Sequence, residues 1–395
     1  MLGFQDFVQA RFALQRPDTV MDWTASWTGG SSAARHPYLQ SQALRGHSAW
    51  DSEFYISIAL HGYEDPAMRA ASPQSTPDAE VAAPKKTHPT WVSLNHAFFP
   101  GYPFAMGLIA RPLAAIGEDP VSAATLAGVI VSLVSALFAM LAIADLAAGQ
   151  ADADNGEGLR AAFFLAVWPA AVFLAQVYSE ALFLALSFGA LAMMRRAAWG
   201  WAAALAVAAV FTRATGVLLV IPFGLVWLFG GERRTVGGAV LAASPVAAYL
   251  VWRLFLGADF DFVETRYFGR WPFAIQGSLE AWRDFAETLL SDDDPQLRAY
   301  DMVEAFGIVA SLVASALLWP RDKALTLYGL ATFGVVALSG AALGMHRYAL
   351  AMPALFLAPA HLAARLPVFD RLWTLLCCLG LAVLTLLFTF GFWAG

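Results

Sequence analysis

Two carboxylates near the start of the chain have the type and spacing that acid–base chemistry needs. Asp51 and Glu53 stand two positions apart in the aromatic-rich segment WDSEFY, residues 50–55. A carboxylate beside a hydroxyl can take its proton and turn the oxygen into a nucleophile. Asp51 is equally suited to cap the helix that the following residues predict. Glu53 could assist a metal or a sugar hydroxyl, or it could lie on a solvated helix face.

Charged residues within apolar sequence form a second set of candidates. Glu180 lies between two apolar runs, and an ionised carboxylate at the centre of a bilayer costs about 2.5–3.5 kcal/mol. Arg213 interrupts an otherwise apolar stretch from 199 to 230. It could pair with Glu180, bind a lipid phosphate through its forked guanidinium, or extend to the membrane interface.

Basic and aromatic residues at the predicted membrane surface complete the candidates for substrate binding. Some follow a predicted helix end, where they could bind phosphate or anchor the chain at the interface. Others occur in a long polar stretch, where aromatic rings could stack on a sugar, or near the helix that follows Asp51. These residues are Tyr55, His96, Tyr102, Arg266, Arg270, Trp271, His346 and Arg347.

The elements that must position these residues are membrane helices. The 395 residues are 59% hydrophobic and only 14% charged, whereas a soluble domain carries roughly a quarter charged residues. Residues 372–393 contain no charge, and about 20 apolar residues cross a bilayer as a helix. The sequence therefore predicts an all-α, polytopic integral membrane protein. The net charge of −6 argues against a nucleic-acid partner.

Apolar runs and polar loops divide the chain into four parts. Residues 1–96 form an N-terminal segment and first loop, with an interfacial helix at 47–63 and a flexible insertion at 64–94. Membrane helices occupy 97–256, a second long loop follows at 257–303, and further membrane helices occupy 304–395. The apolar runs predict nine to eleven membrane helices, at 98–116, 121–147, 160–177, 181–194, 199–211, 214–230, 236–256, 304–320, 324–343, 347–364 and 372–393.

Short basic loops predict the orientation, because such loops stay on the cytoplasmic side. They are Arg195–Arg196, Arg233–Arg234, Arg321–Lys323 and Arg365–Arg371, and an even number of crossings separates each consecutive pair. Glu180, Arg213, the 257–303 loop and His346–Arg347 then fall on the opposite side. This common side is the first indication of a site.

Several short motifs occur in a fixed order along the chain. They are WDSEFYISIALHGY at 50–63, FFPGYP at 98–103, YSE at 178–180 and TRATG at 212–216. In this order they resemble the PIG-V family of mannosyltransferases, which includes prokaryotic members and belongs to the GT-C class of membrane glycosyltransferases. The resemblance covers roughly residues 47–350.

The resemblance implies an enzyme that moves a mannosyl group, with inversion, from a polyprenyl-phosphate donor to an acceptor hydroxyl on the extracytoplasmic face. Asp51 matches the family's Asp in the first extracytoplasmic loop and is the expected base. The implied partners are the lipid bilayer, the lipid-linked donor and a glycan, lipid or protein acceptor. No soluble cofactor is implied, and a divalent metal is compatible with the carboxylates. A prokaryotic source would place the protein in the cell membrane.

Two features depart from the family pattern. The resemblance implies a membrane helix before the Asp51 segment, and residues 1–46 contain no apolar run that predicts one. Counting crossings back from Arg195, a full span at 98–116 would also place Asp51 on the cytoplasmic side. Because this segment contains three prolines and Arg111, we expect it to be a re-entrant or interfacial helix.

Two other functions fit the same composition. A lipid or solute transporter would also use many apolar helices with intramembrane charges, although the sequence shows no clear inverted repeat. A non-catalytic relative of the family would bind the lipid-linked sugar without transferring it.

Overall fold

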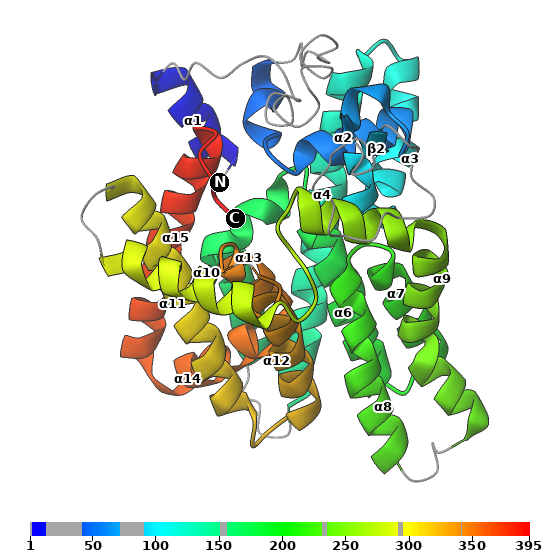
Figure 1. The fold of residues 1–395 in the computed structure, drawn as a ribbon. Helices are drawn as coiled ribbons and strands as arrows, with labels where there is room; N and C mark the ends of the chain where they lie inside the picture. Colours follow the sequence, from blue (N-terminus) through cyan, green and yellow to red (C-terminus); the bar gives the residue numbers. More distant parts are fainter. Residues whose placement is uncertain are drawn as a thin grey trace.

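A computed structural model describes residues 2–12, 42–71, 91–150, 156–230, 235–290, 295–340 and 342–395. Most of these residues are helical (Figure 1). The N-terminal part contains α1 (Leu2–Phe12), η3 (Gln42–His47), α2 (Ser52–His61), η4 (Pro66–Met68), β1 (Arg69–Ala71), β2 (Trp91–Ser93) and η6 (Leu94–Ala97). The middle part contains α3 (Gly101–Ala115), α4 (Pro120–Ala148), α5 (Glu157–Val167), η7 (Pro169–Ala175), α6 (Glu180–Arg195), α7 (Trp199–Val210), η8 (Ala214–Leu219), α8 (Val220–Phe229) and α9 (Val236–Arg266). The last part contains α10 (Ile275–Leu290), α11 (Pro295–Leu318), α12 (Lys323–Ala337), α13 (Met345–Tyr348), η10 (Ala349–Ala351), α14 (Ala354–Arg365) and α15 (Pro367–Thr389).

Four helices in the described residues are long and apolar enough to cross a membrane: Pro120–Ala148, Val236–Gly257, Leu297–Leu318 and Pro367–Thr389. A fifth crossing results if α5 and η7, which meet at a bend of 83°, count as one. The protein is thus an α-helical, multi-pass membrane protein. The expected nine to eleven membrane helices also include shorter apolar helices below this length: Trp199–Val210, Ala214–Phe229 and Lys323–Ala337.

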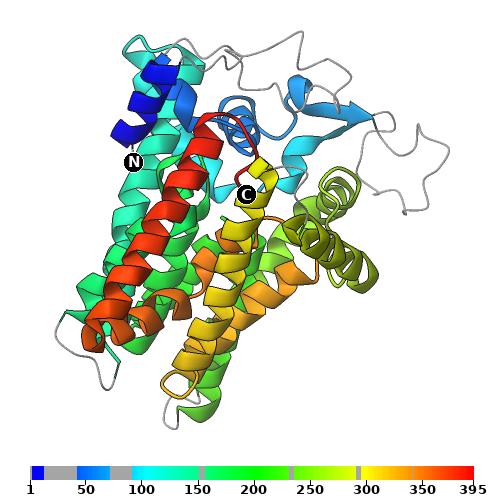
Figure 2. The ribbon, with the colours of Figure 1, turned by 90° about the vertical axis from the view of Figure 1, so that its left-hand side faces the viewer.

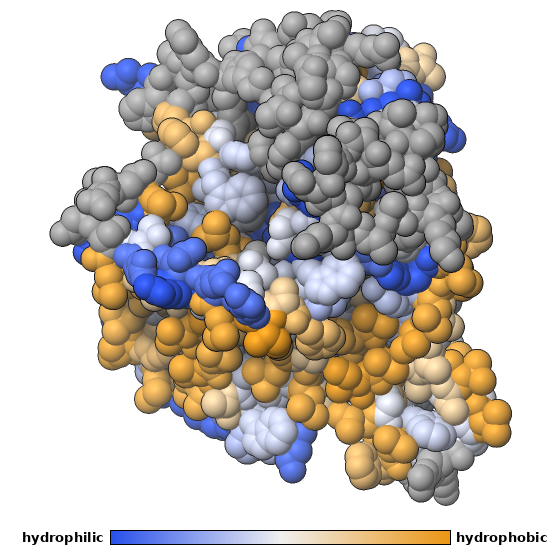
Figure 3. Space-filling model, in the orientation of Figure 1, coloured by the Kyte–Doolittle hydropathy of each residue, from blue (hydrophilic) through white to orange (hydrophobic). Residues whose placement is uncertain are grey.

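Side chains on the outside of these helices are suited to lipid. On α4, for example, Leu133, Val134, Leu137, Phe138 and Leu141 are exposed, while small residues on its other face pack inward. Orange, apolar side chains cover much of the lower half of the face in Figure 3, below the charged side chains of α10. In a membrane this outer surface faces hydrocarbon, so its exposure carries no penalty.

The basic connections gather at one end of the bundle. Arg195 pairs with Asp322, and both Arg321 and Arg365 meet the ring of His361. The α11–α12 and α14–α15 connections lie at the lower end in Figure 1. The fourth predicted basic loop, 233–234, lies outside the described residues.

The opposite end carries the shorter elements. There β1 and β2 pair in an antiparallel sheet. About halfway along the bundle, α10 runs across the long helices (Figure 1). Figure 2 shows α1 alongside α15. The expected flexible insertion at 64–94 is therefore ordered at both ends, through η4, β1 and β2, while residues 72–90 lie outside the described part.

The segment that contains Asp51 differs from the expected surface helix. The first six residues of α2, Ser52–Ser57, are all buried, and α2 packs on α3 and α4. Phe54 stacks on Phe98 with a centroid distance of 4.3 Å. The predicted span at 98–116 is the 15-residue helix α3, which is shorter than a bilayer requires. The structure thus agrees with the expectation that this segment is not a full span.

Candidate active site

Arg347 lies at the centre of a buried cluster of charges. It belongs to the four-residue helix α13, which follows the left-handed Gly344, φ +83°. The Arg347 Nη2 atom donates a hydrogen bond of 2.6 Å to Asp51 Oδ2, and its Nε donates to Glu180 Oε1. The third nitrogen, Nη1, donates to the carbonyl oxygen of Gly395 at 2.9 Å. One guanidinium therefore joins two carboxylates, Asp51 and Glu180, that are far apart in the sequence.

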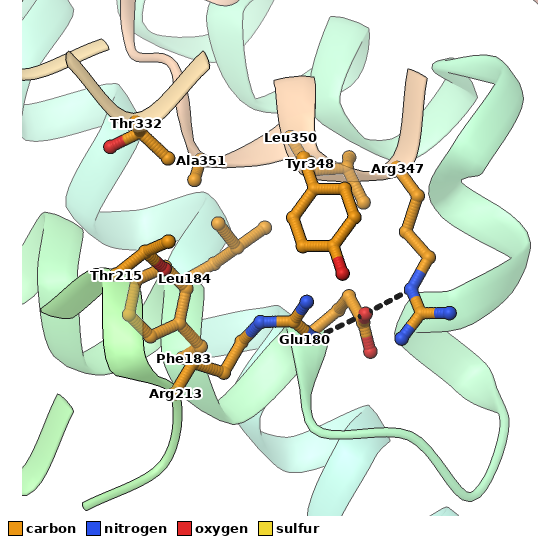
Figure 4. A pocket seen from close by; sticks show the side chains of 10 residues that line it. All are labelled: Glu180, Phe183, Leu184, Arg213, Thr215, Thr332, Arg347, Tyr348, Leu350 and Ala351. Carbon is orange, nitrogen blue, oxygen red and sulfur yellow. Dashed lines mark hydrogen bonds and ion pairs between the residues drawn. The ribbon is translucent and has the colours of Figure 1, made fainter. Parts of the chain in front are cut away.

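Glu180 is shared by two arginines (Figure 4). Arg213 Nη1 donates to the same Oε1 atom at 2.5 Å and to Ser179 Oγ at 3.2 Å. The Glu180 side chain is 3% exposed, so both cations are needed to compensate a charge that has left water. Its second oxygen, Oε2, is buried and has no hydrogen-bond partner in the described part of the chain. This atom can therefore accept a further hydrogen bond.

The local fold explains why Glu180 occupies this place. The 3-10 helix η7 and a short turn lead into α6, which begins at Glu180. A carboxylate at the first turn of a helix is stabilised by the helix dipole. Tyr55 on α2 bonds to Ser179 through their hydroxyls at 2.8 Å, which fixes the turn against the Asp51 helix.

A pocket opens beside these charges. Its wall combines Arg213, Arg347 and Glu180 with apolar side chains. The apolar part is formed by Phe183, Leu184, Leu350 and Ala351. Figure 4 shows the Tyr348 ring above the point where the two guanidiniums meet Glu180. The cavity is small, about 10 Å³, which is roughly the space that one water molecule needs. Its wall combines charged side chains with apolar ones, as the binding of a charged head group on a hydrocarbon chain requires.

The second loop brings a third arginine to the same place. Arg270 donates to the hydroxyl of Tyr348, and its guanidinium carbon lies 5.2 Å from the centre of that ring. Arg213 lies at 5.1 Å from the same ring. Nearby, burial raises the pKa of Glu264 to about 7, with Arg270 opposing the shift and Asp51 adding to it. Glu264 thus exchanges a proton close to neutral pH.

The two predicted roles of the first carboxylates can now be compared with the structure. Asp51 occupies the N-cap position of α2, yet among the described residues its side chain makes no capping hydrogen bond. The carboxylate points instead to Arg347, so the capping interpretation is wrong. Glu53 is 4% exposed, which contradicts the solvated helix face, and its part in catalysis stays a prediction.

Three of the predicted substrate-binding residues belong to the charge cluster and line the pocket: Arg213, Arg347 and Glu180. Tyr55 bonds to Ser179, next to Glu180, and Arg270 bonds to Tyr348 in the wall of the pocket. Arg266, at the end of α9, and Trp271 are exposed. The backbone N–H of Trp271 donates to Ser339 at 2.9 Å, which ties the second loop to the end of α12.

The remaining predicted residues are engaged elsewhere. His96 Nε2 bonds to Glu64 at 3.1 Å, and its other ring nitrogen lies 3.8 Å from Asp259. The Tyr102 hydroxyl donates to the carbonyl of Gly128 at 2.9 Å within the core. His346 turns away from the pocket toward Glu304. Their substrate-binding roles remain untested, and these contacts favour structural ones.

Sequence reasoning missed Tyr348, Glu264 and Glu304. Tyr348 directly follows His346 and Arg347, so the local motif already contained its signal. Glu264 and Glu304 stand in ordinary amphipathic sequence, and only the folded chain shows what they approach. Among the described residues, no group of three or more His, Cys, Asp and Glu side chains could hold a metal ion.

Comparisons with known proteins match this part of the chain to one family. Residues 87–226, about a third of the chain, match the family described as Mannosyltransferase (PIG-V). The GPI alpha-1,6-mannosyltransferase 2 of Mus musculus is 32% identical over 177 residues, 44% of this chain and 29% of the relative. That of Cricetulus griseus is 32% identical over 216 residues, 53% of this chain and 36% of the relative. The resemblance to PIG-V is confirmed.

The aligned part thus spans about a third of the mammalian PIG-V relatives' own length. The PIG-V match includes Glu180 and Arg213, whereas Asp51 and Arg347 lie outside its bounds. Among solved structures, the oligosaccharyltransferase of Archaeoglobus fulgidus aligns with 94% of this chain and 55% of its own, at 12% identity and a TM-score of 0.44.

Proposed function

We propose that this protein is a membrane mannosyltransferase of the GT-C class that uses a polyprenyl-phosphate-linked sugar as donor. One observation carries the proposal: Asp51 is held by Arg347, whose guanidinium lines a pocket together with Arg213 and Glu180. The similarity to the PIG-V family and to GPI alpha-1,6-mannosyltransferases supports mannose as the sugar.

The charges of the cluster suit a lipid phosphate. Three guanidiniums, of Arg213, Arg270 and Arg347, surround Tyr348, against the carboxylates of Asp51 and Glu180. Forked guanidiniums bind phosphate oxygens with two parallel hydrogen bonds. The apolar wall of Phe183, Leu184 and Leu350 would contact the first part of the lipid chain.

The proposed reaction is a single displacement at the anomeric carbon. The Asp51 carboxylate takes the proton of the acceptor hydroxyl, whose oxygen bonds to the anomeric carbon from the face opposite the phosphate. The bond from this carbon to the phosphate oxygen breaks, and its electron pair leaves with the lipid phosphate. The guanidiniums stabilise the charge that develops on the leaving group. Configuration at the anomeric carbon is therefore inverted.

The contacts of Asp51 support different tasks for its two oxygens in the proposed reaction. Oδ2 accepts from Arg347, which orients the carboxylate, and Oδ1 takes the acceptor's proton. The free Oε2 atom of Glu180 accepts from a hydroxyl of the transferred sugar. A carboxylate held by a fixed guanidinium needs little reorganisation when the reaction begins.

The orientation of the protein supports an extracytoplasmic site. The described basic connections lie at the end of the bundle away from α2, and short basic loops stay in the cytoplasm. The pocket would then be reached from the other side, where the acceptor would also be found. A cysteine introduced in place of the exposed Arg266 would be labelled by a membrane-impermeant reagent in intact cells if this orientation is correct.

The decisive experiment is Asp51→Asn, assayed with mannosyl-phosphoryl polyprenol and a hydroxyl acceptor. Removing a general base typically lowers the rate by about 10²–10⁴-fold, and we expect a loss in this range with the protein still folded. Asp145→Asn is the matched control, because Asp145 pairs with Arg196 in an exposed position. Unchanged turnover of Asp51→Asn would contradict the mechanism, and uptake of donor into vesicles without product would favour a transporter.

A further inference from the structure

Glu304 on α11 is a buried carboxylate that meets the turn carrying Arg347. Its side chain is 0% exposed. Its Oε1 accepts from the backbone N–H of His346 at 3.0 Å, and its Oε2 accepts from the N–H of Gly344 at 3.2 Å. The ring Nδ1 of His346 also donates to Oε2. One carboxylate thus holds two backbone groups and one side chain of the same short segment.

Tyr300, one helical turn before Glu304, strengthens this attachment. Its hydroxyl donates to Glu304 Oε2 at 3.0 Å and accepts from the Gly344 N–H at 3.2 Å. The beginning of α13 is therefore held by two side chains of α11. A four-residue helix has too few internal hydrogen bonds to fix its own position, so these external contacts determine where it lies.

The polar groups of His346 are all used within the protein. Besides its bonds to Glu304, the ring Nε2 contacts the carbonyl oxygen of Ala394 at 3.0 Å. The carbonyl oxygen of His346 accepts from Trp168 Nε1 at 3.3 Å. Both ring nitrogens lie within hydrogen-bond distance of oxygen atoms of the protein. His346 therefore anchors this segment to its surroundings.

The backbone of α11 approaches this segment unusually closely. A Cβ atom at Gly307 would lie 2.7 Å from the Cβ of His346 and 3.1 Å from its Cα. Glu304 and Gly307 are three positions apart and share one face of the helix. The carboxylate of Glu304 and the absence of a side chain at Gly307 therefore both allow α11 to pack closely against His346.

From these contacts we propose that Glu304 is a positioning residue for the active site. It fixes the position of His346. This sets the backbone position from which the side chain of the next residue, Arg347, extends to Asp51 and Glu180. The inference rests on the proposed function, because it assigns Arg347 to the reaction. Misplacing a reacting group by about 1 Å can cost about 10²-fold in rate. We therefore expect Glu304→Gln to lower mannosyl transfer by about 10–100-fold.

A matched control exists at the other end of the bundle. Glu157 is also buried and also bonds to a histidine, with its Oε1 atom 2.9 Å from Nδ1 of His361. Glu157→Gln removes the same charge from the same kind of pair, away from Arg347. If Glu304 only supports the fold, the two variants should lose similar amounts of thermal stability and of activity. If it positions Arg347, only Glu304→Gln should lose transfer at comparable thermal stability.

The test that separates positioning from stability is a double-mutant cycle with Arg347→Lys. Since Glu304 acts through Arg347, the double variant should transfer mannose no more slowly than Arg347→Lys alone, within about twofold. Losses that multiply would overturn the proposal, as would full activity of Glu304→Gln. Absence of transfer by the unmodified protein would contradict the proposed function instead. In that case the affinity for polyprenyl phosphate is measured for the unmodified protein, the two single variants and the double variant. We again expect the double variant to bind no more weakly than Arg347→Lys, and losses of affinity that multiply would overturn the proposal.

Discussion

Asp51 and Arg347 are 296 positions apart and are joined by a hydrogen bond of 2.6 Å. The contact joins the N-terminal part of the protein to its C-terminal part, because Asp51 precedes α2 and Arg347 belongs to α13. The same guanidinium also bonds to Glu180 at the start of α6. The three residues therefore report on the relative placement of the first, middle and last parts of the protein.

Arg347 should be irreplaceable by another cation. In Arg347→Lys a single ammonium takes the place of the planar fork, so it cannot hold Asp51 and Glu180 in their present directions. We expect mannosyl transfer to fall by about 10²-fold. The assay is turnover at saturating donor and acceptor in detergent-solubilised protein. Arg195→Lys is the control, since Arg195 pairs with Asp322 in the basic end of the bundle, and an equal loss there would contradict a special role for Arg347.

Glu180 should contribute far more to stability than an ion pair at the protein's edge. Glu180→Gln leaves two buried guanidiniums without their shared anion, and breaking a buried pair costs about 3–5 kcal/mol. Asp370→Asn is the comparison, because Asp370 and Arg160 have side chains 21% and 39% exposed, and such pairs contribute about 0–1 kcal/mol. Thermal unfolding in detergent measures both. Equal shifts of the midpoint would show that the Glu180 cluster is hydrated.

The sequence predicted the membrane fold because hydrophobicity is a property of short segments. The exact bounds of the membrane helices were harder to predict, because an apolar run does not reveal where the chain bends. The run at 160–177, for example, becomes α5 and η7 at 83° to each other. The burial of α2 was also missed, since Phe54 and Tyr55 could face lipid or protein, and only the arrangement of α3 and α4 decides between them.

The candidate site was predictable to the extent that its residues interrupt apolar sequence. Glu180, Arg213 and Arg347 were visible in this way, and Asp51 through the motif around it. The pairing of Arg213 with Glu180 was one of the predicted alternatives and is confirmed. The contact of Asp51 with Arg347 was not predicted, because sequence separation contains no information about which charges meet. Glu304 illustrates the limit: it lies in an amphipathic stretch, and its importance comes from three bonds to a segment about 40 positions away.

Glu264 should make stability depend on pH near neutrality. Its pKa is raised from 4.5 to about 7, chiefly by burial, so the folded protein holds this proton more tightly than the unfolded chain. Stability therefore falls as the pH rises from about 4.5 to 7, and the loss is complete above the folded pKa.

Glu264→Gln removes this titration. Relative to the unmodified protein, the variant should gain up to about 3 kcal/mol between pH 5 and pH 8. Unfolding midpoints at the two pH values measure the difference. Glu287→Gln is the control, because Glu287 is exposed and pairs with Arg283 on α10. A Glu264 variant with the same pH profile as the unmodified protein would show that the carboxyl ionises normally.

Gly216 should be intolerant of any side chain. A Cβ there would lie 2.7 Å from the backbone nitrogen of Val210 and 2.8 Å from the carbonyl carbon of Ala209. Backbone atoms cannot rotate away, so η8 would have to shift, and Arg213 directly precedes η8. We expect Gly216→Ala to destabilise the protein by about 1–3 kcal/mol and to lower transfer beyond what stability alone explains.

Gly224→Ala, in the same part of the chain, separates close approach from the general effect of losing a glycine. A Cβ at Gly224 meets no described atom within 4 Å, and the residue lies inside α8. Alanine favours a helix interior over glycine by about 0.8–1.0 kcal/mol, so this variant should unfold at the same temperature or slightly higher, with unchanged transfer. Similar behaviour of the two alanine variants would mean that η8 and α7 can separate without moving Arg213, and the close contact would then have no bearing on the site.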